Sequence, residues 1–210
     1  AKERLSNIMQ DSTSLIVDYV RALYMRSSLY NLKPLTTSQE IMASEITNPI
    51  FLGIIQDMNQ QMQPRQKTTT KKFAVCKAPQ VPEKELLTAL IARHKGKVQF
   101  IDFWATWCGG CRQIIKEYEP LKKEIGEDKV AFIYLTGPSS IKSTWDILIQ
   151  DISGEHYWLN KEQWGYLWSH FQMTGLPMYL IIDKKGNIAK QFTHVTAKEL
   201  KELLELEVNR

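Results

Sequence analysis

Two cysteines stand three positions apart in the stretch DFWATWCGGCRQ, residues 102–113, directly after a tryptophan. Such a C-x-x-C pair, here Cys108 and Cys111, holds a metal ion, anchors a haem, crosslinks the chain or carries out thiol–disulfide exchange. A structural zinc site takes about four thiolate or imidazole ligands, and the chain has no second C-x-x-C and no histidine pair with matching spacing. A c-type haem requires a histidine directly after the second cysteine, where this chain has Arg112. A structural crosslink and a redox pair remain.

The residues around the pair favour redox chemistry. A continuous apolar run, 98–104, is typical of a strand buried on both faces, and the segment 111–126 has the apolar spacing of a helix. Cys108 therefore falls where a strand ends and a helix begins. Free backbone N–H groups and the positive end of the helix dipole stabilise a thiolate there, and the thiolate is the attacking species. Cys111, one helical turn further on, is able to resolve a mixed disulfide. A structural crosslink does not explain this position.

Two stretches resemble the thioredoxin-like family. IDFWATWCGGC, residues 101–111, is similar to the active-site signature of the family, and GLPMYLIIDKKGNI, residues 175–188, is similar to its cis-proline strand and hairpin. The long insertion before this proline, about 139–171, resembles the TlpA/ResA branch of extracytoplasmic thiol–disulfide oxidoreductases. The resemblance covers roughly residues 74–210. The helical segment before it is similar to that of secreted TlpA-like proteins of Bacteroidetes type.

The resemblance implies catalytic roles for Cys108, Cys111 and Asp102. Cys108 corresponds to the nucleophile, Cys111 to the resolving cysteine and Asp102 to the buried acid of thioredoxins. A carboxylate between Ile101 and Phe103 is expected to be desolvated, which raises its pKa and suits a proton acceptor for Cys111. The alternative interpretation of Asp102 is a strand-end acid held in an ion pair, because buried acids are usually paired.

The same resemblance implies a substrate-binding surface. Pro177 corresponds to the cis-proline that faces the disulfide, and Leu176 and Pro177 are expected to hold a substrate strand by main-chain hydrogen bonds. Trp107 corresponds to the aromatic residue beside the pair. Gly109 and Gly110 leave room for the backbone of a partner, but they replace the usual Gly-Pro of the family. This departure bears on the reduction potential and therefore on the direction of electron flow.

These residues predict a thiol–disulfide oxidoreductase that acts on protein substrates, with reduction favoured over oxidation. The dithiol carries the electrons, so no metal or organic cofactor is expected. The resemblance further implies an extracytoplasmic location (periplasm or cell envelope) and a membrane-linked electron donor or acceptor. The alternative function is a non-catalytic interaction module on the same scaffold, acting through the helical region. A peroxide reductase is a third hypothesis, but its usual P-x-x-x-T-x-x-C setting is missing.

Other candidate residues have simpler explanations. Cys76 is either a third redox thiol or a small buried hydrophobe, and a lone cysteine is more often the latter. The tryptophans of the insertion either line a groove for a partner or form a core, and the core is favoured; they are Trp145, Trp158, Trp164 and Trp168. His156 and His170 are expected to be satisfied polar residues and not metal ligands.

Size and composition limit the remaining function classes. The chain has 210 residues, of which 43% are hydrophobic and 24% charged, as in ordinary globular proteins. Its net charge of +4 is spread among acidic residues, so no nucleic-acid partner is expected. No apolar run reaches the roughly 18 residues of a membrane span. The first ten residues lack the apolar core of a signal peptide.

The elements that must position the pair follow from periodicity. Residues 1–72 are expected to be helical, ending in a polar linker: an apolar stripe runs over 5–24, Thr37 and Glu40 suggest a capping box, and Pro49 should divide the next helix. The second predicted domain is residues 73–210, with a helical insertion at about 139–171. From residue 98 on, its predicted order is β-α-β-α-β-β-α, in which the insertion supplies the second α. The predicted class is α/β: a thioredoxin fold, with a mixed central sheet flanked by helices, after an N-terminal α-helical region.

Overall fold

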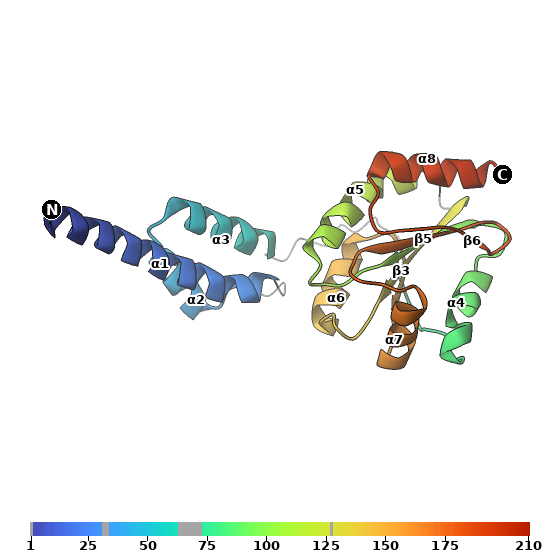
Figure 1. Ribbon diagram of the computed structural model, residues 1–210, viewed down its shortest axis with the longest axis horizontal. Helices are drawn as coiled ribbons and strands as arrows, with labels where there is room; N and C mark the ends of the chain where they lie inside the picture. The colour runs from blue at the N-terminus through green and yellow to red at the C-terminus, as the bar shows by residue number, and fades with distance from the viewer. Residues whose placement is uncertain (1, 31–33, 63–72, 127) are drawn as a thin grey trace. The chain divides into compact units, whose positions relative to one another are not determined.

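The computed structural model describes residues 2–30, 34–62, 73–126 and 128–210. The chain divides into two compact units, Ala1–Thr68 and Thr69–Arg210, each of which is described by itself (Figure 1). The border expected from the sequence, between 72 and 73, lies a few residues further on. Both positions border or fall in 63–72, outside the described residues.

The described part of the first unit consists of α1 (Lys2–Tyr30), α2 (Thr37–Ser44) and α3 (Pro49–Met62). Pro49 divides the helical stretch as predicted, because α3 begins on it, where a backbone N–H is not needed. The capping box of α2 was predicted one residue too late. The Thr36 hydroxyl accepts the Gln39 backbone N–H, and the Gln39 side chain accepts the Thr36 N–H. Consecutive threonines followed by two polar residues make both frames plausible from sequence.

The first unit has a small core, made by Met25, Leu29, Leu35, Ala43, Ile46 and Ile55. The apolar stripe of α1 lies outside this core: each of Leu15, Ile16, Tyr19, Val20, Leu23 and Tyr24 is at least 41% exposed. Its earlier members, Leu5, Ile8 and Met9, lie outside the side chains that the structure describes. α1 is instead tied to the start of α3 by a polar residue. Asp18 Oδ2 accepts the backbone N–H groups of Thr47 and Asn48 at 2.9 and 2.8 Å.

The described elements of the second unit are β1 (Phe73–Cys76), α4 (Glu83–Ala92), β2 (Val98–Phe103), α5 (Gly109–Ile125), β3 (Val130–Thr136), α6 (Lys142–Leu148), the 3₁₀ turn η1 (Ile149–Asp151), β4 (Gly154–Trp158), α7 (Lys161–His170), β5 (Met178–Ile182), β6 (Ile188–Phe192) and α8 (Ala197–Val208). The strands form one sheet in the order β1-β4-β3-β2-β5-β6. The first four are parallel, while β5 and β6 run antiparallel to their neighbours. This mixed sheet confirms the predicted fold class.

The sequence predicts a partly helical insertion and does not predict the strand β4. Its sequence, GEHYW, has no apolar run, and it starts at Gly154 with φ of 127°. A Cβ at Gly154 would approach the Phe132 carbonyl oxygen to 2.6 Å, so glycine is required where β4 passes β3. The insertion therefore contributes α6, β4 and α7, and β4 joins β1 to the rest of the sheet.

Helices cover both faces of the sheet, as predicted (Figure 1). One core contains side chains of α5, α6 and α8 together with Phe100 and Trp104. The other contains side chains of α4 and α7 together with Ile101 and Phe103. Successive residues of a strand point to opposite faces, so β2 contributes to both cores and all six of its residues are buried. Within the described residues, no helix is long and apolar enough to cross a membrane.

Candidate active site

Cys108 and Cys111 are joined by a disulfide at the start of α5, with their Cα atoms 5.2 Å apart. Cys108 is the N-cap of the helix, and its Sγ accepts the backbone N–H of Cys111 at 3.1 Å. The two sulfurs differ in access, because Cys108 is 8% exposed and Cys111 is 0% exposed. The outer sulfur is therefore the one that a partner can reach. Its position at a helix N-terminus favours the thiolate form once the disulfide is reduced.

Local sequence explains why the pair takes this position. β2 ends at Phe103, and the loop that follows turns into α5 through Gly109 and Gly110. Both glycines are exposed. A Cβ at Gly110 would meet no atom within 4 Å, so the fold does not require glycine there. The effect of the two glycines is to keep the surface beside the disulfide free of side chains.

In the folded chain, the stretch that contains Pro177 lies beside the stretch that contains the cysteine pair. The Leu176–Pro177 peptide bond is cis, as the resemblance implies. The carbonyl oxygen of Leu176 lies 3.8 Å from Cys108 Sγ, although the two residues are 68 positions apart. Leu176 packs against both cores of the sheet, which fixes the loop that carries it. The structure thus brings Leu176 and Pro177 to the outer sulfur.

Asp102 lies in the centre of the sheet, beside Tyr134 of β3 and Tyr179 of β5. It faces the core that contains Cys111, because the residues two positions away along the chain, Phe100 on β2 and Trp104 just after it, belong to that core. Asp102 is fully buried, and neither carboxyl oxygen has a hydrogen-bond partner among the described residues. Burial raises the pKa of Asp102 well above its ordinary value, and the charge of Lys122 opposes this only in part. The ion-paired interpretation of Asp102 is therefore wrong.

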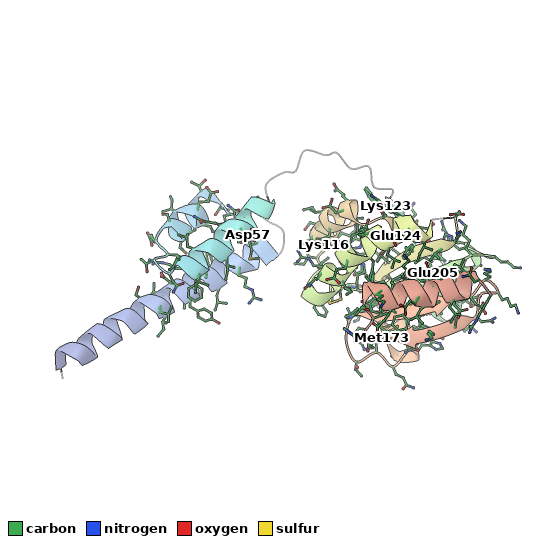
Figure 2. All side chains as sticks on the ribbon, turned by 90° about the horizontal axis from the view of Figure 1, so that it is seen from above. Asp57, Lys116, Lys123, Glu124, Met173 and Glu205 are labelled. Atoms are coloured by element: carbon green, nitrogen blue, oxygen red, sulfur yellow. A yellow bond between two sulfur atoms is a disulfide. The ribbon has the colours of Figure 1, made fainter. Side chains whose placement is uncertain are left out.

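A buried ion pair on α5 was not predicted from the sequence. Lys122 Nζ donates to Glu119 Oε1 and to the Ser153 carbonyl oxygen, the latter at 2.7 Å, and lies 4.7 Å from the centre of the Tyr134 ring. Lys123 and Glu124, labelled in Figure 2, lie on the exposed side of the same helix. Spacing alone does not reveal which of two consecutive lysines is buried. Lys122 brings a positive charge to the core face that Asp102 shares.

The loop after β3 holds the active-site loop in place. Ser140 Oγ accepts the Thr106 backbone N–H at 3.0 Å, and Thr106 Oγ1 accepts the Ile141 N–H at 3.2 Å. Trp107, the residue directly before the pair, is about half exposed, and its indole N–H donates to Ser139 Oγ at 3.2 Å. These contacts join residues more than 30 positions apart, so only the parallel pairing of β2 with β3 brings them together.

The remaining candidates have structural roles. Cys76 is a free, half-buried thiol on the edge strand β1. Burial raises its pKa, and the Glu155 carboxylate adds to this effect, which disfavours the thiolate form that a redox cysteine needs. Trp145 is fully buried, and Trp158, Trp164 and Trp168 pack against the two cores, which confirms that these tryptophans form a core.

The two histidines of the insertion also make structural contacts, but the expectation of a satisfied side chain fails at His156 Nδ1, which is buried without a hydrogen-bond partner among the described residues. His156 Nε2 bonds to the Ile152 carbonyl oxygen at 3.0 Å, and burial lowers the pKa of this imidazole to about 4. The ring of His170 stacks on Tyr166. Among the described residues, no group of three or more His, Cys, Asp or Glu side chains is arranged to hold a metal ion.

Comparisons with known proteins agree with this geometry. Residues 96–188 match the family model described as thioredoxin-like. The chain is 29% identical over 162 residues to the thioredoxin-like protein YneN of Bacillus subtilis, a match that covers 68% of this chain and 86% of that protein. The structure is similar to the thioredoxin domain of a thiol-disulfide oxidoreductase from Bacteroides vulgatus, with a TM-score of 0.51 and 18% identity over 56% of this chain and 84% of that one. The second unit of the chain therefore has a thioredoxin-like fold.

Proposed function

We propose that the protein is a thiol–disulfide oxidoreductase that reduces disulfides of protein substrates with the Cys108–Cys111 pair. The observation that carries this proposal is the asymmetry of the pair. Cys108 Sγ is the more accessible sulfur and accepts a backbone N–H at the first turn of α5, while Cys111 is buried below it. One sulfur is suited to attack from solvent and the other to internal resolution.

The reaction starts from the reduced pair. The Cys108 thiolate attacks one sulfur of a substrate disulfide, which forms a Cys108–substrate disulfide and releases the other substrate sulfur as a thiolate. The Cys111 thiolate then attacks Cys108 Sγ, which forms the Cys108–Cys111 disulfide and releases the second substrate thiolate. Two electrons pass from the enzyme dithiol to the substrate, and the same steps in reverse oxidise a substrate. The exchange requires no metal or organic cofactor.

Asp102 is proposed as the proton acceptor in the second step. Cys111 must lose its proton before it attacks, and it is fully buried, so water is not at hand. The carboxyl of Asp102 faces the same core, has no hydrogen-bond partner among the described residues and has a raised pKa. These properties raise the proton affinity of Asp102 toward that of a thiol. The proton affinity of an exposed carboxylate is further from it.

Substrate binding is proposed at the loops beside Cys108. Leu176 and Pro177 lie next to the outer sulfur, where the main chain of the loop would pair with an extended substrate segment. Gly109 and Gly110 leave this side free of side chains, and the half-exposed Trp107 borders it. Each of these groups would touch the substrate backbone or the residues that flank its cysteine.

The finer assignment is a TlpA/ResA-type enzyme of the periplasm or cell envelope, supplied by a membrane-linked electron donor. It is supported by the resemblance of the insertion and of the helical segment to that branch. The test is thiol trapping in host cells with an alkylating reagent after fractionation. We expect the protein in the extracytoplasmic fraction, with the Cys108–Cys111 pair mostly reduced and becoming oxidised when membrane electron transfer is blocked. A reduced pair in the cytosolic fraction would contradict the assignment.

Insulin reduction with a matched electron donor tests the activity itself. Wild type should reduce insulin, and Cys108→Ser should fall to the uncatalysed rate because it removes the nucleophile. Cys111→Ser should accumulate the mixed disulfide, since nothing resolves it. If wild type is no faster than Cys108→Ser, the protein is not an oxidoreductase and the interaction-module hypothesis gains support. Direction follows from the reduction potential: a value near about −270 mV indicates a reductant, and one near about −120 mV an oxidant.

A further inference from the structure

Among the described side chains, α1 carries seven large apolar residues that are exposed to solvent, and no other helix or strand carries more than two. They are the apolar stripe and Val17. The charged residues of this stretch are bound within the first unit: Asp18 accepts N–H groups at the start of α3, and Arg21 Nη2 lies 2.6 Å from Glu45 Oε2. A helix that is apolar on nearly every side is typically buried on every side. The outward side of α1 is therefore expected to be covered by a partner.

The surroundings of α1 favour one kind of partner over two others. A helix that lies on a membrane surface keeps a polar side in water, usually one rich in Lys and Arg. The side of α1 that faces away from the stripe packs instead into the core of the first unit, through Met25 and Leu29. In the second unit, the exposed large apolar side chains of the described residues are scattered over different elements, at most two on each. A second copy of the chain, by contrast, presents a stripe of the same length and character.

The size of the stripe fits a contact between two copies. Seven large side chains that are each about half exposed present on the order of 600 Å² per copy, so two facing stripes reach roughly the lower bound of about 1,200 Å² for specific interfaces. The first unit, Ala1–Thr68, also has a core of six apolar side chains among the described residues. Units this small often gain the burial that their own core lacks by oligomerisation.

We propose that the chain forms a symmetric dimer through the apolar stripe of α1. The same stripe on both copies meets across a two-fold axis, so that each residue contacts its counterpart or a neighbour of it. Ile16, Val20 and Leu23, spaced by four and three residues, lie on one side of the helix and form the centre of the contact. Arg26, three residues after Leu23, is exposed at its charged border, as is usual for the rim of an interface. Dimerisation through α1 does not depend on the exchange reaction of Cys108.

The first unit offers a matched control. Ile16 is 60% exposed in the stripe, and Ile41 is 61% exposed on α2, outside it. Ile16→Lys and Ile41→Lys therefore place the same charge at the same exposure on two helices of one unit. Val20→Lys, at a residue that is 57% exposed, is a second substitution within the stripe. Each residue replaced is more than half exposed in a single copy, so the fold of that copy should tolerate the lysine.

The experiment is sedimentation velocity of the full chain at increasing concentration, in a reductant that excludes a dimer linked through the free thiol of Cys76. We expect wild type to shift from monomer to dimer as its concentration rises from about 1 to about 100 μM. Ile16→Lys and Val20→Lys should raise the Kd of the dimer at least about 30-fold, because both copies would bury an unpaired charge. Ile41→Lys should change it by less than about threefold.

A dimer that Ile16→Lys and Val20→Lys weaken and Ile41→Lys keeps supports the proposal. Wild type that stays monomeric at the highest concentration overturns it, as does an equal Kd for Ile16→Lys and Ile41→Lys. Flotation with vesicles of phosphatidylcholine and phosphatidylglycerol tests the bilayer: if monomeric wild type binds and Ile16→Lys does not, the stripe is a membrane contact and the dimer is wrong.

Two controls keep the dimer separate from the exchange reaction and from folding. Cys108→Ser removes the proposed nucleophile and should dimerise with the Kd of wild type. Failure of insulin reduction with an intact dimer therefore rejects the proposed function alone, and a monomer that reduces insulin rejects the dimer alone. Circular dichroism shows whether each lysine variant keeps its helices, and the two stripe variants are read independently.

Discussion

Among the described residues, each of the two units buries one aspartate, and the two side chains have opposite surroundings. In the helical unit, Asp18 Oδ2 accepts the Thr47 and Asn48 backbone N–H groups and the Thr47 hydroxyl, and Arg21 lies 3.7 Å from Oδ1. In the thioredoxin-like unit, Asp102 has no hydrogen-bond partner among the described residues. Both side chains are at most 2% exposed. The solvent exposure of the two side chains is similar, but Asp102 lies much deeper in its unit, and the hydrogen-bond partners differ.

The pKa values move in opposite directions as a result. Burial acts to raise the pKa of Asp18, but the hydrogen bonds from Asn48 and Thr47 and the Arg21 charge outweigh it and lower the pKa. Burial raises the pKa of Asp102 with little to oppose it. A carboxylate with many partners ties helices together, whereas an unpartnered buried carboxyl destabilises the fold and is retained where chemistry needs it. The comparison separates a structural acid from a candidate catalytic one.

The units also differ in how they use apolar side chains. The helical unit leaves much of α1 exposed, together with Ile41, Ile50 and Ile54, while its core is small. The thioredoxin-like unit buries residues on both faces of a six-stranded sheet. All six tryptophans lie in the second unit. Tryptophan fluorescence therefore reports on that unit, and far-ultraviolet circular dichroism reports on both.

The largest expected effect is on stability and sharpens this contrast. Ile133→Ala removes a buried side chain from the middle of β3 and should lower the free energy of unfolding of the second unit by about 2–5 kcal/mol. Ile50→Ala removes a side chain that is 68% exposed and should change either transition by less than about 0.5 kcal/mol. Urea unfolding followed by fluorescence and circular dichroism measures both. A large loss in Ile50→Ala would show that this face is covered in solution.

The second prediction separates the two aspartates by function. Asp102→Asn removes the proposed proton acceptor and should slow resolution of the mixed disulfide by about 100-fold. Asp18→Asn should leave that rate within about twofold. The measurement is acid quenching of single-turnover reactions, followed by mass spectrometry of the mixed disulfide. Resolution at the wild-type rate in Asp102→Asn would remove Asp102 from the mechanism.

The third prediction uses pH, and the two aspartates give opposite signs. The folded-state pKa of Asp102 lies above the unfolded value of about 3.9. The unfolded chain then binds fewer protons between these values, so this group lowers stability as pH rises through that window. Asp102→Asn should therefore gain stability over wild type as pH rises, by about 1.4 kcal/mol for each pH unit of the window crossed.

Asp18 has a folded-state pKa below its unfolded value, so its contribution is present above the unfolded pKa and is lost as pH falls toward the folded one. Asp18→Asn should lose stability at pH 7, and its difference from wild type should shrink in acid. Urea unfolding of the oxidised proteins between about pH 3 and pH 8 checks both signs. If the stability of both variants relative to wild type changed in the same direction with pH, the proposed difference between the two aspartates would be wrong.

The smallest expected effect concerns Cys76. Its raised pKa keeps it protonated at neutral pH, beside Glu155 on the edge of the sheet. Cys76→Ser should change insulin reduction by less than about twofold. In the reduced protein, Cys76 should be alkylated more slowly than Cys108, because the thiolate is the reacting species. Loss of activity in Cys76→Ser would restore the hypothesis of a third redox thiol.

Sequence was most informative where one local pattern decides the structure. The apolar runs of β2 and β3 and the glycine that stops α5 predict the strand–helix unit that carries the pair. The resemblance supplied Pro177, which no propensity indicates. Local patterns were not sufficient for β4, a short strand with polar residues that is stabilised by pairing on both sides.

Contacts across the sheet were also beyond sequence reasoning. Tyr134 and Tyr179 flank Asp102 because of the strand register. Ser140 accepts a hydrogen bond from Thr106 because the loops after β2 and β3 begin at the same edge of the sheet. Lys122 is buried because its turn of α5 faces the Ser153 carbonyl. Each of these placements depends on which strands are neighbours, and residue spacing along the chain does not contain that information.

Cys108 Sγ accepts a hydrogen bond from the Cys111 amide. The same sulfur atom therefore caps α5 and is the proposed reacting atom. Whatever happens at this sulfur, whether it is charged, bonded to Cys111 or bonded to a substrate, changes the strength of the acceptor that caps α5. The Cys111 amide proton is therefore a built-in spectroscopic reporter, whose nuclear magnetic resonance frequency should take a separate value in each redox state. A titration of the isotope-labelled protein followed at this one proton would distinguish the intermediates of the cycle.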